Sequence, residues 1–227
     1  MSLTKVAIIG ANGKVGRLLT TKLKSLKTEF EPLAIVRNDS QASHFEKLGI
    51  NCTVISLEDT VENLSKALKG CNAVVFTAGA GGGSLERTFS IDLDGAVKII
   101  EVCQKNKIER FIMVSAIRAD ERDFWYNSSL RSYYIAKKYA DSELRKSGLK
   151  YTILQPGYLK DGKGSGKVAE IQKALSAEKF EDTQFIYRDD VAQAIVLSLK
   201  NNRTIGKTIP LINGDIPIDE FLDTIVV

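Results

Sequence analysis

The sequence is poor in histidine and carries little net charge. Of its 227 residues only His44 is a histidine, and 32 Lys and Arg residues stand against 28 Asp and Glu residues, for a net charge of +4. A metal site with two or more His ligands is therefore excluded, and we expect no metal. His44 lies in the polar stretch Gln41–Lys47, as a surface helix residue would, although it is also the one possible centre of a Ser-His-Asp triad. The charges are too weak and too evenly mixed to indicate a nucleic-acid partner.

Cysteines and long apolar segments are also scarce. Cys52, Cys71 and Cys103 are odd in number, scattered and set among apolar residues. This predicts buried, reduced thiols in an intracellular protein, with a redox-sensing cysteine as the alternative. No segment reaches the ~18 apolar residues of a membrane helix, and the N-terminal run Val6–Ala11 is too short for a signal peptide. We therefore expect a cytoplasmic protein with no membrane partner.

Strand-length apolar runs alternate with helix-period segments along the chain. Strands are predicted over residues 5–9, 33–36, 52–57, 73–77, 111–114, 151–154 and 208–212. Helices are predicted from the glycine-rich turn to residue 26 and over residues 40–48, 61–68, 96–103, 129–146, 190–200 and 219–226. The pattern predicts an α/β fold: a single-domain, Rossmann-type doubly wound parallel sheet with a small irregular C-terminal cap.

The predicted domain spans residues 1–227. Residues 1–157 form its dinucleotide-binding core, and residues 158–227 complete the sheet and the substrate pocket. We expect the Gly- and Lys-rich segment Lys160–Lys167 to be mobile.

The first strand runs directly into a glycine-rich turn that opens a helix. Its three glycines, Gly10, Gly13 and Gly16, follow a G-x-x-G-x-x-G spacing. They allow a tight turn, close approach of the backbone to a pyrophosphate, and close packing of helix on strand. The helix N-terminus then offers free N–H groups to the phosphates. The sequence therefore predicts a dinucleotide site, with Asn12, Lys14 and Val15 as further cofactor-binding residues.

The end of the second strand indicates which dinucleotide binds. An NAD site places Asp or Glu here to bond the ribose 2′-hydroxyl, but this chain has Arg37. Arg37 can bind a 2′-phosphate in a fork and stack on the adenine, with help from Lys14, Arg17 and Ser40. Asp39 is an acidic residue nearby and argues for NAD, although it could instead be present to cap the following helix. We predict NADP(H).

Ligands of open α/β sheets lie outside the carboxyl ends of the strands. That rule places further residues around the crevice: Leu57, Glu58, Thr77, Ala78, Gly79, Ala80, Ser115, Ala116, Gln155, Pro156 and Gly157. We assign Leu57, Glu58, Thr77, Ala78, Gly79, Pro156 and Gly157 to the cofactor. The loop from Gly79 to Gly83 either approaches the ligand with its backbone or is a plain flexible turn.

Tyr133 and Lys137 form the candidate catalytic pair. Four residues apart on a predicted helix, they share a face. A Lys ammonium beside a phenol lowers the phenol's pKa from about 10, so that Tyr133 could transfer a proton while the nicotinamide carries the hydride. Tyr134 and Lys138 repeat the spacing one residue on, and Tyr133 could also be an aromatic residue that only packs.

Several motifs recur together in a known family. They include Gly10-x-x-Gly13-x-x-Gly16, Asp92-Leu-Asp-Gly95, Tyr133-x-x-x-Lys137 followed by Ala140-Asp141, Tyr151-Thr-Ile-Leu-Gln-Pro-Gly157 and Arg188-Asp-Asp-Val-Ala192. Nearly the whole chain resembles the atypical short-chain dehydrogenases/reductases, in the NAD(P)H-binding branch of NmrA-like and flavin/biliverdin-reductase-like proteins, and the resemblance implies a fungal or bacterial member. Gln155 departs from it, because many relatives carry Arg there.

The resemblance implies roles for particular residues. It favours Lys137 over Lys138 as the lysine that binds the nicotinamide ribose, and it implies that Ser115 holds the substrate carbonyl. Phe124, Trp125 and Tyr126 form either a wall for a flat apolar substrate or an aromatic plug.

Two functions fit these residues best. The first is an NADPH-dependent oxidoreductase that reduces a small carbonyl, quinone or flavin-like acceptor. The second is an NADP(H)-binding sensor without turnover, and a non-redox isomerase is a distant third. The small-molecule substrate and the oligomeric state are not specified by the sequence.

Overall fold

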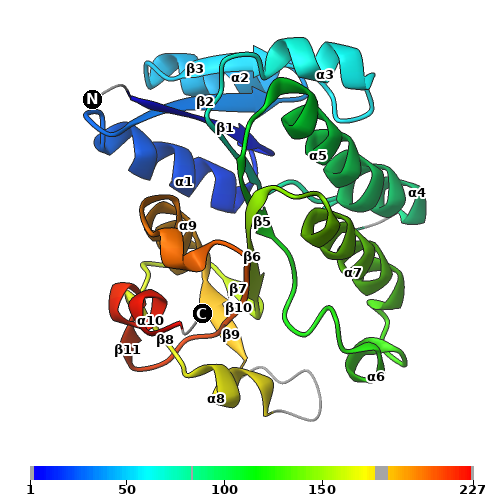
Figure 1. The fold of residues 1–227 in the computed structure, drawn as a ribbon, viewed down its shortest axis with the longest axis vertical. Coiled ribbons are helices and arrows are strands. Elements are labelled where there is room, and N and C mark those ends of the chain that lie inside the picture. The colour runs from blue at the N-terminus through cyan, green and yellow to red at the C-terminus, as the bar shows by residue number, and fades with distance from the viewer. Residues whose placement is uncertain (1–2, 83, 177–183, 226–227) are drawn as a thin grey trace.

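A seven-stranded parallel sheet forms the centre of the computed structural model, which describes residues 3–82, 84–176 and 184–225. The strand order is β3-β2-β1-β4-β5-β6-β10, so the chain leaves β1 toward one edge, returns, and continues from β4 toward the other (Figure 1). The strands are β1 (Thr4–Ile9), β2 (Phe30–Val36), β3 (Asn51–Val54), β4 (Ala73–Phe76), β5 (Arg110–Val114), β6 (Lys150–Pro156) and β10 (Lys207–Leu211). The order reverses beside β1 and β4, which is where such sheets bind dinucleotides.

Helices cover both faces of the sheet, as expected from its nearly continuous apolar strands. One face packs on helices α1 (Lys14–Ser25), α2 (Asp39–Lys47), α9 (Arg188–Lys200) and α10 (Ile218–Thr224). The other packs on α3 (Val61–Ala67), α5 (Gly95–Asn106) and α7 (Arg131–Lys146). Within β1, Val6 and Ile8 face the first layer, whereas Ala7 and Ile9 face the second, because successive strand residues point to opposite sides. The doubly wound α/β fold is confirmed.

The elements after β6 are shorter and partly separate from the main sheet. Two small sheets pair β7 (Tyr158–Lys160) with β9 (Phe185–Tyr187), and β8 (Lys167–Val168) with β11 (Ile216–Pro217). Helix α8 (Ile171–Leu175) and the 3-10 helix η2 (Asn202–Thr204) complete this part. Strand β10 nevertheless joins the main sheet beside β6, and α9 packs against α1. The region beyond residue 157 therefore contributes to the central fold as well as to the cap.

Three expected element ends and caps differ from the structure. The third strand ends at Val54 rather than at Leu57, because the chain turns out of the sheet after pairing with β2. Asn38, not Asp39, caps α2: its side chain accepts from the Gln41 N–H, and Asp39 lies in the first turn. The last helix ends at Thr224, and Val226 lies outside the described residues.

The segment Lys160–Lys167, expected to be mobile, is instead held to α9. The carboxylate of Asp190, which is 2% exposed, accepts from the backbone N–H groups of Ser165 and Gly166 at 2.9 and 2.8 Å. The carboxylate of Asp189 accepts from the Gly164 N–H at 3.2 Å. Charge-assisted bonds of this kind hold a glycine-rich turn in one conformation.

A feature that the sequence did not predict lies between β4 and α5. After the short helix α4 (Leu85–Arg87), a π-helix η1 spans Thr88–Asp94. π-Helical turns are rare and concentrate at functional sites. The remaining helix, α6 (Arg122–Trp125), precedes α7. None of the described helices combines the length and apolar composition needed to cross a lipid bilayer.

Candidate functional site

The glycine-rich turn between β1 and α1 is packed so closely that side chains cannot fit. Gly10 has a φ of +80°, and a Cβ atom there would lie 2.6 Å from the Ala78 Cα atom. A Cβ atom on Gly16 would lie 2.5 Å from the Gly10 carbonyl oxygen. Only glycine combines a positive φ with such approach, so the turn lies directly against the chain that leaves β4.

The turn leaves the N-terminus of α1 open. Gly13 caps the helix without a side-chain hydrogen bond, and its first turn contains no acidic residue. Arg17 stabilises the turn, because its Nη2 atom donates to the Asn12 Oδ1 atom at 2.6 Å and its Nε atom donates to the Asn12 carbonyl at 3.1 Å. Open N–H groups at a helix N-terminus suit phosphate oxygens. This cradle of glycine backbone fits the pyrophosphate of a dinucleotide.

A cavity of about 290 Å³, here called the adenine cavity, extends from the turn over the ends of β2, β3 and β4. Its lining includes these predicted cofactor-binding residues: Gly10, Asn12, Gly13, Arg37, Leu57, Glu58, Thr77, Ala78 and Gly79. Gln41 and Arg87 also line it, and neither was predicted. Gln41 accepts from the Arg37 N–H at 3.2 Å, which anchors the backbone that carries the Arg37 side chain.

The cations expected around a 2′-phosphate are not all in this cavity. Arg37 lines it, whereas Lys14 instead forms an ion pair with Asp161 at 2.6 Å. Arg17 is bonded to Asn12, and the Ser40 hydroxyl donates to the Asn38 side chain at 2.8 Å. Arg37 is therefore the predicted cation that remains available at the adenine cavity.

A second cavity, of about 470 Å³, adjoins the first and is here called the central cavity. Gly13 and the segment from Thr77 to Ala80 line both. The central cavity also receives Lys14, Val15, Ser115, Tyr133 and Lys137. A third, of about 240 Å³, shares Ser115 and Tyr133 and includes Pro156 and Gly157; we call it the outer cavity. Of the residues assigned to catalysis or to the cofactor, Gly16 lines none of the three, because it packs against the turn itself. Gln155, Arg17 and Ser40, which were expected nearby, do not line them either.

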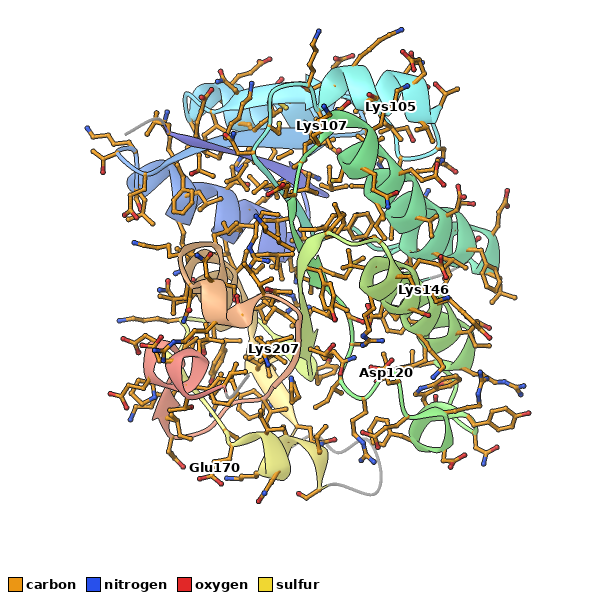
Figure 2. The ribbon with its side chains drawn as sticks, in the orientation of Figure 1. Lys105, Lys107, Asp120, Lys146, Glu170 and Lys207 are labelled. Carbon is orange, nitrogen blue, oxygen red and sulfur yellow. The ribbon has the colours of Figure 1, made fainter. Side chains whose placement is uncertain are left out.

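The structure distinguishes the two Tyr-x-x-x-Lys spacings of α7. Tyr133 and Lys137 line the central cavity, and the Lys137 Nζ atom lies 5.7 Å from the centre of the Tyr133 ring. Tyr134 is 1% exposed and stacks on Trp125 with ring centres 5.7 Å apart. Lys138 turns away and donates to the Asp120 carbonyl at 2.8 Å; Asp120 lies on the chain that follows β5 (Figure 2).

Asp92 is a site residue whose role the sequence did not reveal. It is 1% exposed within the π-helix η1, its Oδ1 atom lies 3.3 Å from the Lys137 Nζ atom, and its Oδ2 atom accepts from the Ala80 N–H at 2.8 Å. Lys137 also donates to the Val114 carbonyl at 3.2 Å. Asp92 thus connects the Gly79-Ala80 segment to the candidate catalytic lysine. The signal available in the sequence was an Asp placed between two apolar residues, Ile91 and Leu93.

The expected activation of Tyr133 is not present in this structure. Burial raises the pKa of Tyr133, and the neighbouring carboxylates of Asp92 and Asp141 raise it further, which outweighs the lowering by Lys137. For Lys137, burial favours the neutral amine, but Tyr133 and the same carboxylates outweigh it and raise the pKa. At neutral pH the pair is therefore a protonated phenol beside an ammonium, which can donate a proton rather than accept one.

Ser115 is engaged by a second buried carboxylate. Its hydroxyl donates to the Asp141 Oδ2 atom at 2.6 Å, and the Gln155 Nε2 atom approaches the same oxygen at 3.4 Å. Ser115 itself is 3% exposed. The hydroxyl proton expected to hold a substrate carbonyl is thus directed at Asp141.

Asp141 should make the stability of the fold depend on pH. Burial raises its pKa from the ordinary 3.8 to about 6, against the opposing Ser115 bond and the charges of Lys137 and Arg145. Between about pH 4 and 6 the folded state therefore holds a proton that the unfolded state has lost, so the free energy of unfolding falls as pH rises through this window. At about 1.4 kcal/mol per pH unit this contribution is about 3 kcal/mol. We expect Asp141→Asn to remove the fall, measured by urea unfolding at pH 4 and pH 7; an unchanged pH dependence would contradict the assignment.

The contacts of the aromatic run Phe124-Trp125-Tyr126 are with other parts of the protein rather than with a cavity. Trp125 is 1% exposed, stacks on Tyr134 and donates from its Nε1 atom to the Ala119 carbonyl at 3.0 Å. None of the three aromatics lines the adenine, central or outer cavity. Phe124 and Trp125 pack against Tyr134 of α7, whereas Tyr126 is 42% exposed and its ring contacts the Arg131 guanidinium. These contacts agree with the plug rather than with a substrate wall.

Comparison with known proteins agrees with this geometry. The model of a family described as NAD(P)H-binding matches residues 10–202, which begin at the glycine-rich turn. The chain is 47% identical to UPF0659 protein YMR090W of Saccharomyces cerevisiae, over 99% of this chain and all of that one. A Bacillus halodurans structure, named as an NAD-dependent epimerase/dehydratase, is 38% identical with a TM-score of 0.86 and covers 97% of this chain and 99% of its own. The oxidoreductase ylbE of Lactococcus lactis is 31% identical with a TM-score of 0.81, over 97% and 95% of the two chains.

Proposed function

The chain belongs to the NAD(P)H-binding family, and from that membership we propose that it is an NADPH-dependent oxidoreductase of the atypical short-chain dehydrogenase/reductase type. Its acceptor is a small carbonyl, quinone or flavin-like molecule, and its place of action is the cytoplasm. The observation that carries the proposal is the shared lining of the adenine and central cavities, which lets one dinucleotide extend from Arg37 to Tyr133 and Lys137.

The residues of the central cavity suit a reduction. When bound, the nicotinamide supplies the hydride. Lys137, held by Asp92 and the Val114 carbonyl, is positioned to bond the ribose beside it. Tyr133, whose pKa is raised by burial, keeps its proton at neutral pH and can donate it to the oxygen of the acceptor as charge develops there. The same raised pKa disfavours the reverse direction, which needs a phenolate.

The test is NADPH oxidation, followed at 340 nm, against aldehydes, quinones and free flavins. We expect NADPH to be oxidised with at least one of these acceptor classes, and not to be oxidised when no acceptor is added. Tight NADPH binding without consumption by any of these acceptors would instead support the NADP(H)-binding sensor. That second function has one observation in its favour, since Asp92 pairs with Lys137 and leaves Tyr133 without activation.

The preference for NADPH is assigned to Arg37. Its side chain lines the adenine cavity, and no described carboxylate forms an ion pair with it. A guanidinium bond to a phosphate is worth about 1.5–3 kcal/mol, so Arg37→Ala should weaken NADPH about 10- to 100-fold and NADH less than about threefold. Fluorescence titration of both nucleotides measures this. Arg203→Ala, which changes an exposed arginine outside all three cavities, serves as the control. Equal losses of NADPH and NADH affinity would count against a 2′-phosphate contact.

A further inference from the structure

The outer cavity combines apolar walls with one fixed charge. Leu130, Leu159 and the ring of Tyr158 contribute to its lining, and Tyr133 forms its boundary with the central cavity. Among the described residues that line it, Arg188 is the one that carries a charge. Arg188 also lines the central cavity. A molecule that fills the outer cavity would thus meet an apolar surface, the proton-donating phenol and a guanidinium.

The guanidinium of Arg188 is occupied by an anion of the chain itself. Arg188 is the first residue of α9, its side chain is 22% exposed, and its Nη1 atom donates to the Asp161 Oδ1 atom at 2.8 Å. The other oxygen of Asp161 pairs with Lys14 of the glycine-rich turn at 2.6 Å. These two cations hold the pKa of Asp161 below its ordinary value, Lys14 through the stronger hydrogen bond. Asp161 is therefore a carboxylate at neutral pH, in contact with Lys14 and Arg188.

This internal carboxylate is easily replaced. The Arg188 side chain is 22% exposed, but that of its partner Asp161 is 61% exposed, and an ion pair with a carboxylate so open to solvent contributes about 0–1 kcal/mol. A carboxylate on a ligand within the cavity would be less hydrated, and it could use two of the five guanidinium donors in a fork, a stronger geometry. The free energy lost with the Asp161 contact is small beside that gain.

We propose that the acceptor carries a carboxylate, that its apolar body fills the outer cavity, and that Arg188 binds the carboxylate in place of Asp161. The inference rests on the proposed oxidoreductase function, because it places the reducible group beside Tyr133. It names the substrate class as an apolar carbonyl compound with a carboxylate substituent. Asp161 then competes with the ligand carboxylate for Arg188. Replacing Arg188 should therefore weaken binding of the carboxylate, whereas replacing Asp161 should strengthen it.

The experiment compares 2-naphthoate with the neutral 2-naphthamide as ligands of the NADP⁺ complex, by isothermal titration calorimetry. Arg188→Gln should weaken naphthoate about 10- to 100-fold, whereas Asp161→Asn should tighten it several-fold. Naphthamide affinity should change less than twofold in both variants. Lys146→Gln, at the last residue of α7 in an ion pair with Glu143 (Figure 2), is the control for a lost surface cation.

The outcomes separate this proposal from the proposed function. If Arg188 and Asp161 only stabilised the fold, both variants would change naphthoate affinity in the same direction, and naphthamide affinity would change in that direction too. That result would overturn the carboxylate site. Equal binding of naphthoate and naphthamide to the unaltered protein overturns it as well, even if NADPH is consumed by other acceptors. Because the titration needs no turnover, opposite shifts on a protein that never oxidises NADPH would support the carboxylate site and sink the oxidoreductase function alone.

Discussion

Tyr133→Phe should lower the kcat of NADPH oxidation about 10²- to 10⁴-fold, the range for loss of a general acid, and leave NADPH affinity within about twofold. The ring of Tyr133 lines both the central and outer cavities, and the substitution removes only its hydroxyl. NADPH should still bind, because the glycine-rich turn, Arg37 and Lys137 are unchanged. Steady-state kinetics with the best acceptor of the panel, together with NADPH titration, measures both quantities.

The neighbouring tyrosine is the matched control. Tyr134→Phe makes the same chemical change one residue further along α7, where the ring stacks on Trp125 and is 1% exposed. Tyr134 lines the outer cavity but not the central cavity, where Tyr133 and Lys137 lie. We therefore expect kcat within about twofold of the unaltered protein, and any effect of Tyr134→Phe on acceptor binding to appear in KM. If both variants lost turnover equally, the hydroxyl of Tyr133 would have no special role, and if neither did, the proton would come from elsewhere.

The pH dependence adds a second readout for Tyr133. Because burial raises the pKa of its phenol, the proton is retained throughout the neutral range. The reductive rate should therefore stay level through neutral pH and decline only under alkaline conditions, where the phenol ionises. A rate that increased through this range would indicate a phenolate base and would contradict the proton-donor assignment.

Features set by local sequence were predictable. The glycine-rich turn follows from three glycines at fixed spacing between a strand and a helix, and the structure places Gly10 and Gly16 where a Cβ atom would collide with backbone. The apolar strands followed from their composition, and the sheet order completes the doubly wound arrangement. Residues at strand ends, such as Thr77 and Ser115, came to line the cavities because parallel strands share one carboxyl edge.

Features that depend on packing between distant segments were not predictable. The contact of Asp92 with Lys137 requires the π-helix η1 to place a carboxylate against α7. The link between Lys14, Asp161 and Arg188 joins the first βα turn to the C-terminal part across about 150 residues. The local periodicity of a sequence contains no information on contacts between segments so far apart in the chain. The raised pKa of Tyr133 was missed for the same reason, since it reflects burial and carboxylates from other elements.

The largest effect on the fold should come from Gly10→Ala. Residues other than glycine lose about 1–2 kcal/mol in the left-handed region, and at Gly10 the added Cβ atom would also lie 2.6 Å from the Ala78 Cα atom. Neither atom can rotate away, because the Ala78 Cα atom is backbone and the position of a Cβ atom is fixed by its own backbone. Overpacking of this kind costs about 1–3 kcal/mol. We expect the free energy of unfolding to fall by about 2–5 kcal/mol in urea titrations. NADPH affinity should fall at least about 100-fold, because the turn must move from the phosphates by a fraction of an ångström or more.

Gly70→Ala separates the two causes of that loss. Gly70 has a φ of +79°, nearly that of Gly10, but a Cβ atom there would meet nothing within 4 Å. Its replacement therefore carries the conformational cost alone, about 1–2 kcal/mol, and should leave NADPH affinity unchanged, since Gly70 lines none of the three cavities. The difference between the two variants measures how tightly the glycine-rich turn packs against the end of β4. Equal destabilisation by Gly10→Ala and Gly70→Ala would mean that the turn tolerates a side chain, and that close backbone packing does not define the dinucleotide cradle.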